Sequence, residues 1–102
     1  MTDVVPLKSP FENADYCIKF VRSEMDGSRV GFDQPHFRER LLERDITMRQ
    51  VISTIEKGEI IDGPKKDKYG DWRVKLKRFV AGRKVQVVLA LNSGKCTVVT
   101  VI

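Results

Sequence analysis

The spacing of apolar residues along this chain changes once, from a helical period to an alternation. Apolar residues three and four positions apart predict helices at 10–25, 33–46 and 48–57. Alternating apolar and polar residues predict strands at 72–77, 85–91 and 96–102. Shorter apolar stretches at 29–32 and 60–61 are further strand candidates, and 62–70 is predicted to be a polar loop. This order predicts an α+β fold, with two or three helices packed on one face of a three- or four-stranded antiparallel sheet.

Capping residues indicate where the helices begin. Ser9 starts a capping box before the first helix, and Thr47 with Gln50 forms another before the third. Asp33 is expected to be the N-cap of the central helix. The core-facing stripe of that helix is predicted to contain Phe37, Leu41 and Leu42.

Two-residue turns at 81–82 and 93–94 set the expected strand register. The predicted cross-strand pairs are Trp72 with Leu91, Val74 with Leu89, Leu76 with Val87, Leu89 with Val98, and Val87 with Thr100. The core face of the sheet is therefore predicted to carry Trp72, Val74, Leu76, Val85, Val87, Leu89, Leu91, Val98, Thr100 and Ile102.

The opposite face of the predicted sheet is mixed in character. Its polar part comprises Arg73, Lys75, Lys77 and Gln86, and its apolar part Val88, Ala90, Val99 and Val101. Exposed valines need a cover, so we expect either the first helix or a partner chain there. Self-association through Val88, Val99 and Val101 is one such arrangement.

Positive charge is concentrated in one segment of the chain. The net charge is +5, yet residues 65–84 alone hold nine lysines and arginines against two acidic residues. Localised charge of this kind favours an anionic partner such as RNA. The predicted nucleic-acid contacts are Arg73, Lys75, Lys77, Arg78, Arg83 and Lys84. A solvated strand face explains the same pattern equally well.

The single histidine stands in a second cluster. His36, Arg40 and Arg44 follow one another at four-residue spacing, which stacks them along one side of a helix. A histidine beside two arginines suits phosphodiester chemistry, with a general base next to groups that stabilise a phosphate. Alternatively, all three lie on a solvated face and pair with Glu39 and Glu43.

Other chemistries have little support in the sequence. One histidine and two separated cysteines make no metal-ligand motif, and glycine-rich phosphate loops and acyl-transfer motifs are absent. We therefore expect no metal and no cofactor. The residues indicate a single domain spanning 1–102, with reduced, buried Cys17 and Cys96, a cytoplasmic location and no membrane partner.

The segment from His36 to Thr47 reads His-Phe-Arg-Glu-Arg-Leu-Leu-Glu-Arg-Asp-Ile-Thr. It resembles the pattern His-Ala-x-x-Arg-Met-x-x-Arg-Gly-Ile-Ser of the bacterial family called domain of unknown function 4258. Gly58 to Ile61 and Thr97 to Val101 resemble later parts of that family. The resemblance covers residues 29–102 as a core domain and leaves 1–28 outside as a lead-in and helix. In this chain Asp45 stands in place of the family's glycine, and Phe37 in place of a small residue.

This family is similar to the fold group of barnase, colicin nucleases and RelE-type toxins. The resemblance implies cleavage of RNA without a metal, with His36, Arg40, Arg44 and Thr100 as catalytic residues. The leading hypothesis is therefore a small RelE/barnase-like endoribonuclease of a toxin–antitoxin type system, with RNA and a cognate antitoxin as partners. The alternatives are a non-catalytic nucleic-acid- or protein-binding module, and an oligomerising protein without a nucleic-acid partner.

These hypotheses make different structural demands. A nuclease needs His36 in an open groove, with a second proton donor within about 6 Å. A binding module needs only an exposed basic face. A buried His36 and a covered basic face would favour the oligomerising protein.

Overall fold

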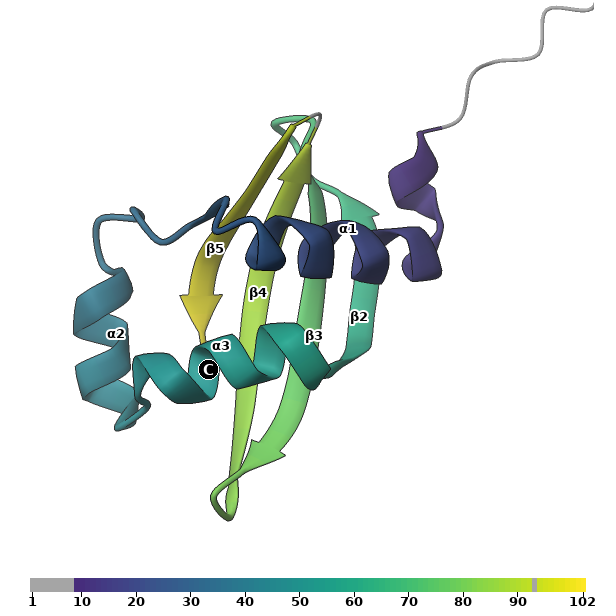
Figure 1. Ribbon diagram of the computed structural model, residues 1–102. Coiled ribbons are helices and arrows are strands. Elements are labelled where there is room, and N and C mark those ends of the chain that lie inside the picture. Colours follow the sequence, from purple (N-terminus) through teal and green to yellow (C-terminus); the bar gives the residue numbers. More distant parts are fainter. Residues whose placement is uncertain (1–8, 93) are drawn as a thin grey trace, which may run out of the picture.

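The computed structural model describes residues 9–92 and 94–102, and consists of helices followed by a sheet (Figure 1). The helical elements are the 3-10 helix η1 (Pro10–Glu12), α1 (Ala14–Asp26), α2 (Phe37–Arg44) and α3 (Met48–Lys57). The strands are β1 (Val30–Gly31), β2 (Glu59–Lys66), β3 (Trp72–Val80), β4 (Arg83–Asn92) and β5 (Lys95–Val101). The predicted α+β class is confirmed.

The sheet has five strands in the order β1-β5-β4-β3-β2, and β1 pairs with β5 in parallel. The prediction of three or four antiparallel strands was therefore wrong. β1 is only two residues long, too short for its partner to be read from the sequence. β2 continues through 62–66, part of the predicted loop, because an edge strand tolerates a proline. The pairing of β2 with β3 shifts register twice. The first shift lies between Ile60 and Asp62, and the second between Asp62 and Lys65, where Gly63 and Pro64 fall.

Both long helices pack on the same face of the sheet (Figure 1). α1 crosses next to α3 and reaches β2, whereas α3 contacts β3 and β4, and α2 lies beside β5. The buried core between these layers comprises Phe11, Cys17, Val21, Val30, Phe37, Ile46, Val51, Ile55, Val74, Leu76, Val85, Val87, Leu89, Leu91, Cys96, Val98 and Val101. Both cysteines are free and buried, as predicted. Because α1 joins α3 on this face, it does not cover the opposite one.

Helix ends follow the predicted capping residues only in part. α3 has the predicted bounds and the predicted capping box between Thr47 and Gln50. Ser9 caps only the short η1, and Asn13 is the N-cap of α1. α2 begins at Phe37 rather than near Asp33, since a turn closed by the hydrogen bond from Phe37 N to Gln34 O precedes it.

One residue of the predicted stripe on α2 faces solvent. Phe37 is buried and Leu41 half-buried, but Leu42 is 83% exposed. With 3.6 residues per turn, a residue five positions after Phe37 lies about 140° around the helix from it. Leu42 therefore cannot share the core-facing side.

The register of β3 with β4 is the predicted one throughout. Between β4 and β5, Leu89 pairs with Val98 as predicted, but Val87 pairs with Val101 rather than with Thr100. Val99 is an extra residue at this point, and a β-bulge reverses which side chains face the core. Val101 is accordingly buried and does not belong to the apolar surface predicted for self-association, and Ile102 is 40% exposed.

Candidate nucleic-acid interface

The sheet face opposite α1 and α3, here called the open face, is covered by no helix of the described residues (Figure 1). Strand alternation and the cross-strand pairs define its side chains. They are Glu59, Asp62 and Lys65 of β2, Arg73, Lys75, Lys77 and Phe79 of β3, Lys84, Gln86, Val88 and Ala90 of β4, and Thr97 and Thr100 of β5. The open face thus presents a row of cations along β3 next to small and apolar side chains of β4.

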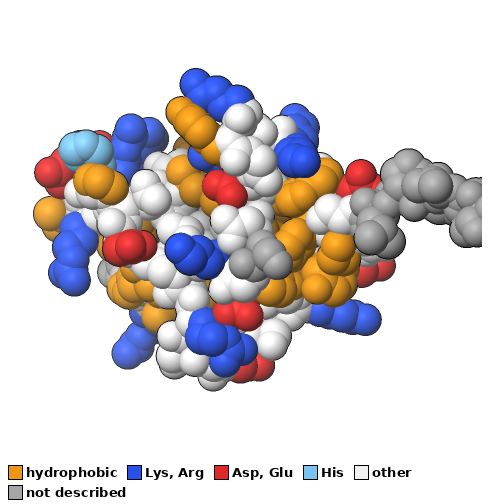
Figure 2. Space-filling model, turned by 90° about the horizontal axis from the view of Figure 1, so that it is seen from above, with side chains coloured by type: hydrophobic (Ala, Val, Ile, Leu, Met, Phe, Trp, Pro, Cys, Tyr) orange, Lys and Arg blue, Asp and Glu red, His pale blue; other side chains and the backbone are white. Residues whose placement is uncertain are grey.

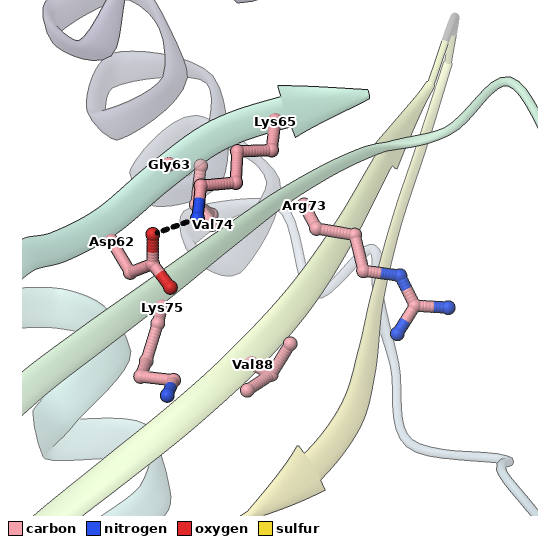
Figure 3. A pocket seen from close by; sticks show the side chains of 7 residues that line it. All are labelled: Asp62, Gly63, Lys65, Arg73, Val74, Lys75 and Val88. Atoms are coloured by element: carbon pink, nitrogen blue, oxygen red, sulfur yellow. Dashed lines mark ion pairs between the residues drawn. The ribbon is translucent and has the colours of Figure 1, made fainter. Parts of the chain in front are cut away.

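A hollow of about 170 Å³ lies on the open face where β2 departs from regular pairing. Figure 3 shows its lining residues, which are Asp62, Gly63, Lys65, Arg73, Val74, Lys75 and Val88. Gly63 has φ +89°, and a Cβ there would lie 2.3 Å from the carbonyl oxygen of Arg73. Only glycine lets β2 approach β3 this closely, so the floor of the hollow depends on it.

Two carboxylates partly neutralise this end of the open face. Lys65 Nζ lies 2.9 Å from Asp62 Oδ1, and Arg73 Nε lies 2.9 Å from Asp67 Oδ2. The hydrogen bond from Lys65, followed by the charge of Lys65, holds the pKa of Asp62 below its ordinary value. Figure 3 shows Lys65 turned toward Asp62, whereas Arg73 and Lys75 extend away from that pair.

Lys75 and Lys77 form no ion pair with any residue that the structure describes. Both side chains are half-buried, because neighbouring strands cover their methylene stems. Two residues of strand separate them by about 7 Å. Together with Lys84, which also forms no ion pair among the described residues, they are the cations of this face that are available to an anionic ligand.

Three of the six predicted nucleic-acid contacts have other partners: Arg73 pairs with Asp67, and Arg78 and Arg83 bond to residues of the helices or at their ends. Arg78 projects to the helix side of the sheet, and its Nη1 donates a hydrogen bond to Ser53 Oγ at 2.8 Å. Arg83 donates hydrogen bonds to the carbonyl oxygens of Asp45 and Arg44, which ties the start of β4 to the end of α2. Arg73, Lys75, Lys77 and Lys84 share the open face.

The structure places His36, Arg40 and Arg44 together on the solvent side of α2. The His36 side chain is 76% exposed, and its Nδ1 lies 3.1 Å from Glu39 Oε2. Figure 2 shows the histidine on the surface at one end of the molecule, next to acidic and basic side chains.

The hollow beside α2 does not include this cluster, since it is lined by Phe32, Phe37, Arg38, Leu41 and Met48. Thr100 lies on β5, where it pairs with Val88 on the open face. No hydrogen bond among the described residues joins Thr100 to the cluster on α2.

Sequence reasoning missed Phe79, which is 66% exposed at the far end of β3. It follows Lys75 and Lys77 at the same two-residue spacing and so shares the open face with them. Lys77 Nζ lies 5.7 Å from the centre of its ring. Extending the predicted strand by two residues, to the next position of the alternation, would have found it.

The architecture is a two-layer α+β fold in which one face of the sheet carries a row of basic side chains and is covered by no described helix. The chain belongs to the family described as Domain of unknown function (DUF4258), whose sequence profile matches residues 34–102. Neither the curated proteins nor the solved structures give a match.

The matched segment contains α2, α3 and strands β2 to β5, whereas α1 and β1 precede it. Within the described part of the chain, no helix has the length and apolar character needed to cross a bilayer. The same residues hold no group of three or more His, Cys, Asp or Glu side chains placed to bind a metal ion.

Proposed function

We propose that this protein is an RNA-binding module that contacts phosphates through its open face. The observation that carries the proposal is the pair Lys75 and Lys77, two neighbouring cations on a bare sheet face. Asp62 and Glu59 stand opposite them on β2, but neither lysine forms an ion pair with a described residue. Lysines that neutralise phosphates release the counterions condensed on a nucleic acid, which supplies most of the sequence-independent affinity.

The shape of the open face favours RNA without a regular duplex. An RNA duplex has a deep, narrow major groove that the side chains of a broad sheet face cannot read. Unpaired strands can lie across such a face and place their phosphates on its cations. The threonines and small side chains of β4 and β5 leave room beside the row of lysines.

Matched charge reversals test this proposal. The test variant is Lys75→Glu with Lys77→Glu, and the control is Arg40→Glu with Arg44→Glu on α2, which changes the net charge equally. Two lost phosphate contacts should weaken binding of oligouridylate by about 25-fold near 0.1 M salt, and repulsion should add to this loss. The control should retain most of its affinity. A larger loss of affinity in the α2 variant would show that the interface lies on α2 and would overturn the proposal.

The second candidate function is the RelE/barnase-like, metal-independent endoribonuclease of a toxin–antitoxin type system. The contact between His36 Nδ1 and Glu39 favours it, because a carboxylate at Nδ1 orients the ring and leaves Nε2 to accept a proton. Arg40 on the same side of the helix would stabilise a phosphate. Against it stands the 76% exposure of the His36 side chain, because a general base works best in a site that shields it from water.

Incubation with total RNA in EDTA distinguishes the two functions. The endoribonuclease hypothesis requires cleavage by the unaltered chain and its loss in His36→Ala. The binding proposal requires retention of RNA without cleavage, and an unchanged affinity in His36→Ala. A cognate antitoxin or a second copy of the chain would instead use the apolar part of the open face around Val88, and would compete with RNA for it.

A further inference from the structure

An exposed aromatic ring ends the row of cations on the open face. Phe79 lies opposite Lys84 of β4, and the ammonium of Lys77 lies 5.7 Å from the ring centre. Most large apolar side chains of the sheet are buried. Phe79, with 66% of its surface exposed, departs from this pattern, and packing in the core does not explain its position.

The surroundings of this ring are rich in positive charge. A hollow of about 240 Å³ is lined by Lys57, Glu59, Lys77, Arg78 and Phe79. Glu59 is the one acid in that lining, and it pairs across the strands with Lys77. Lys57 ends α3, and Arg78 is already bonded to Ser53, so Lys57, Lys77 and Lys84 are the cations that a ligand on the ring would meet.

We propose that the bound RNA is single-stranded and that one of its bases stacks on Phe79. This inference rests on the proposed function. Every nucleobase has a flat face that stacks on an aromatic ring, whichever base it is. Lys75 and Lys77 precede Phe79 along the strand, so a chain whose phosphates follow the lysines brings a base to the ring. Bases inside a duplex already stack on one another and cannot reach it.

Probes that differ only in their bases test the stacking directly. We compare a short oligouridylate with an abasic ribose-phosphate oligomer of equal length and charge. The wild-type chain should bind the oligouridylate about fivefold to tenfold more tightly, at the low end of the range for one base on an aromatic ring. Phe79→Ala should remove this preference and leave affinity for the abasic oligomer unchanged.

Two variants control the interpretation. Leu42→Ala removes another exposed apolar side chain, on α2, and should change neither affinity. Phe79→Trp should retain the preference for oligouridylate, and its added fluorescence should be quenched by oligouridylate but not by the abasic oligomer. Urea titrations establish that each variant is folded before it is compared.

The outcomes separate this inference from the proposed function. If the Lys75→Glu, Lys77→Glu variant loses affinity for both probes while Phe79→Ala loses none, RNA binding stands and stacking is refuted. Binding of duplex RNA as tight as that of oligouridylate also refutes it. If Phe79→Ala instead converts a dimer to a monomer in sedimentation, the ring serves a second copy of the chain and the inference is wrong. Failure of all probes to bind refutes both proposals.

Discussion

Replacing Asp62 by asparagine should tighten RNA binding, because this carboxylate restrains cations of the open face. Asp62 Oδ1 lies 2.9 Å from Lys65 Nζ. The hydrogen bond and charge of Lys65, with a smaller effect of the charge of Lys75, hold the pKa of Asp62 below its ordinary value of 3.8. The group is therefore ionised in neutral buffer, and asparagine removes its charge while keeping its size.

The size of this gain follows from counterion release. Each phosphate contact on a single strand adds about 0.7 to the slope of log K against log salt. We assume that Lys65, once released from Asp62, contacts one more phosphate and that this contact adds no affinity at about 1 M salt. At roughly 0.1 M salt, one decade lower, log K is then higher by about 0.7. This corresponds to about a fivefold higher affinity. An exposed ion pair contributes little to stability, so the fold should be unaffected.

Fluorescence anisotropy with labelled oligouridylate, over a series of salt concentrations, measures both affinity and slope. Glu39→Gln is the matched control, because it removes one negative charge from α2 beside His36. Asp62→Asn should bind more tightly and with a steeper salt dependence, and Glu39→Gln should not. Equal gains in both variants would show that net charge alone governs binding. An unchanged affinity in Asp62→Asn would refute the reasoning.

Three further predictions concern stability, and urea unfolding tests each of them. Leu76→Ala, at a fully buried position, should lower the free energy of unfolding by about 2–5 kcal/mol, and a loss below ~1 kcal/mol would contradict the packing described. Asp45 has φ +52°, so Asp45→Val should cost about 1–2 kcal/mol more than Asp45→Gly, and equal stabilities would argue against the left-handed conformation. Burial raises the pKa of Cys17 to about 11 and that of Cys96 to about 12, from 9.0. The stability that their neutral thiols confer is complete below pH 9.0 and should be lost as the pH rises toward these values, less steeply in a variant with both cysteines replaced by alanine.

The sequence was most informative where residues next to each other in the chain decide the structure. The capping box at Thr47 fixes the start of α3, and the turn at 81–82 fixes the register of β3 with β4. From that register alone, Lys75 and Lys77 could be placed on one face. Asp45, which stands where the family has glycine, takes the left-handed conformation that glycine adopts most readily.

Features that depend on distant contacts could not be predicted in this way. The bulge at Val99 exchanges the sides of Thr100 and Val101, and no single residue type marks it. β1 exists only because its two residues meet the start of β5. The partners of Arg78 and Arg83 likewise come from α3 and from the end of α2, so charge counting overestimated the basic surface.

The most direct test of the open face as an RNA interface is an NMR titration with oligouridylate that follows the lysine side-chain signals together with those of His36. We predict that the signals of Lys75 and Lys77 shift most, with smaller changes at Lys65 and Lys84 and none at His36. Shifts confined to His36 and its neighbours on α2, with Lys75 and Lys77 unmoved, would contradict the account.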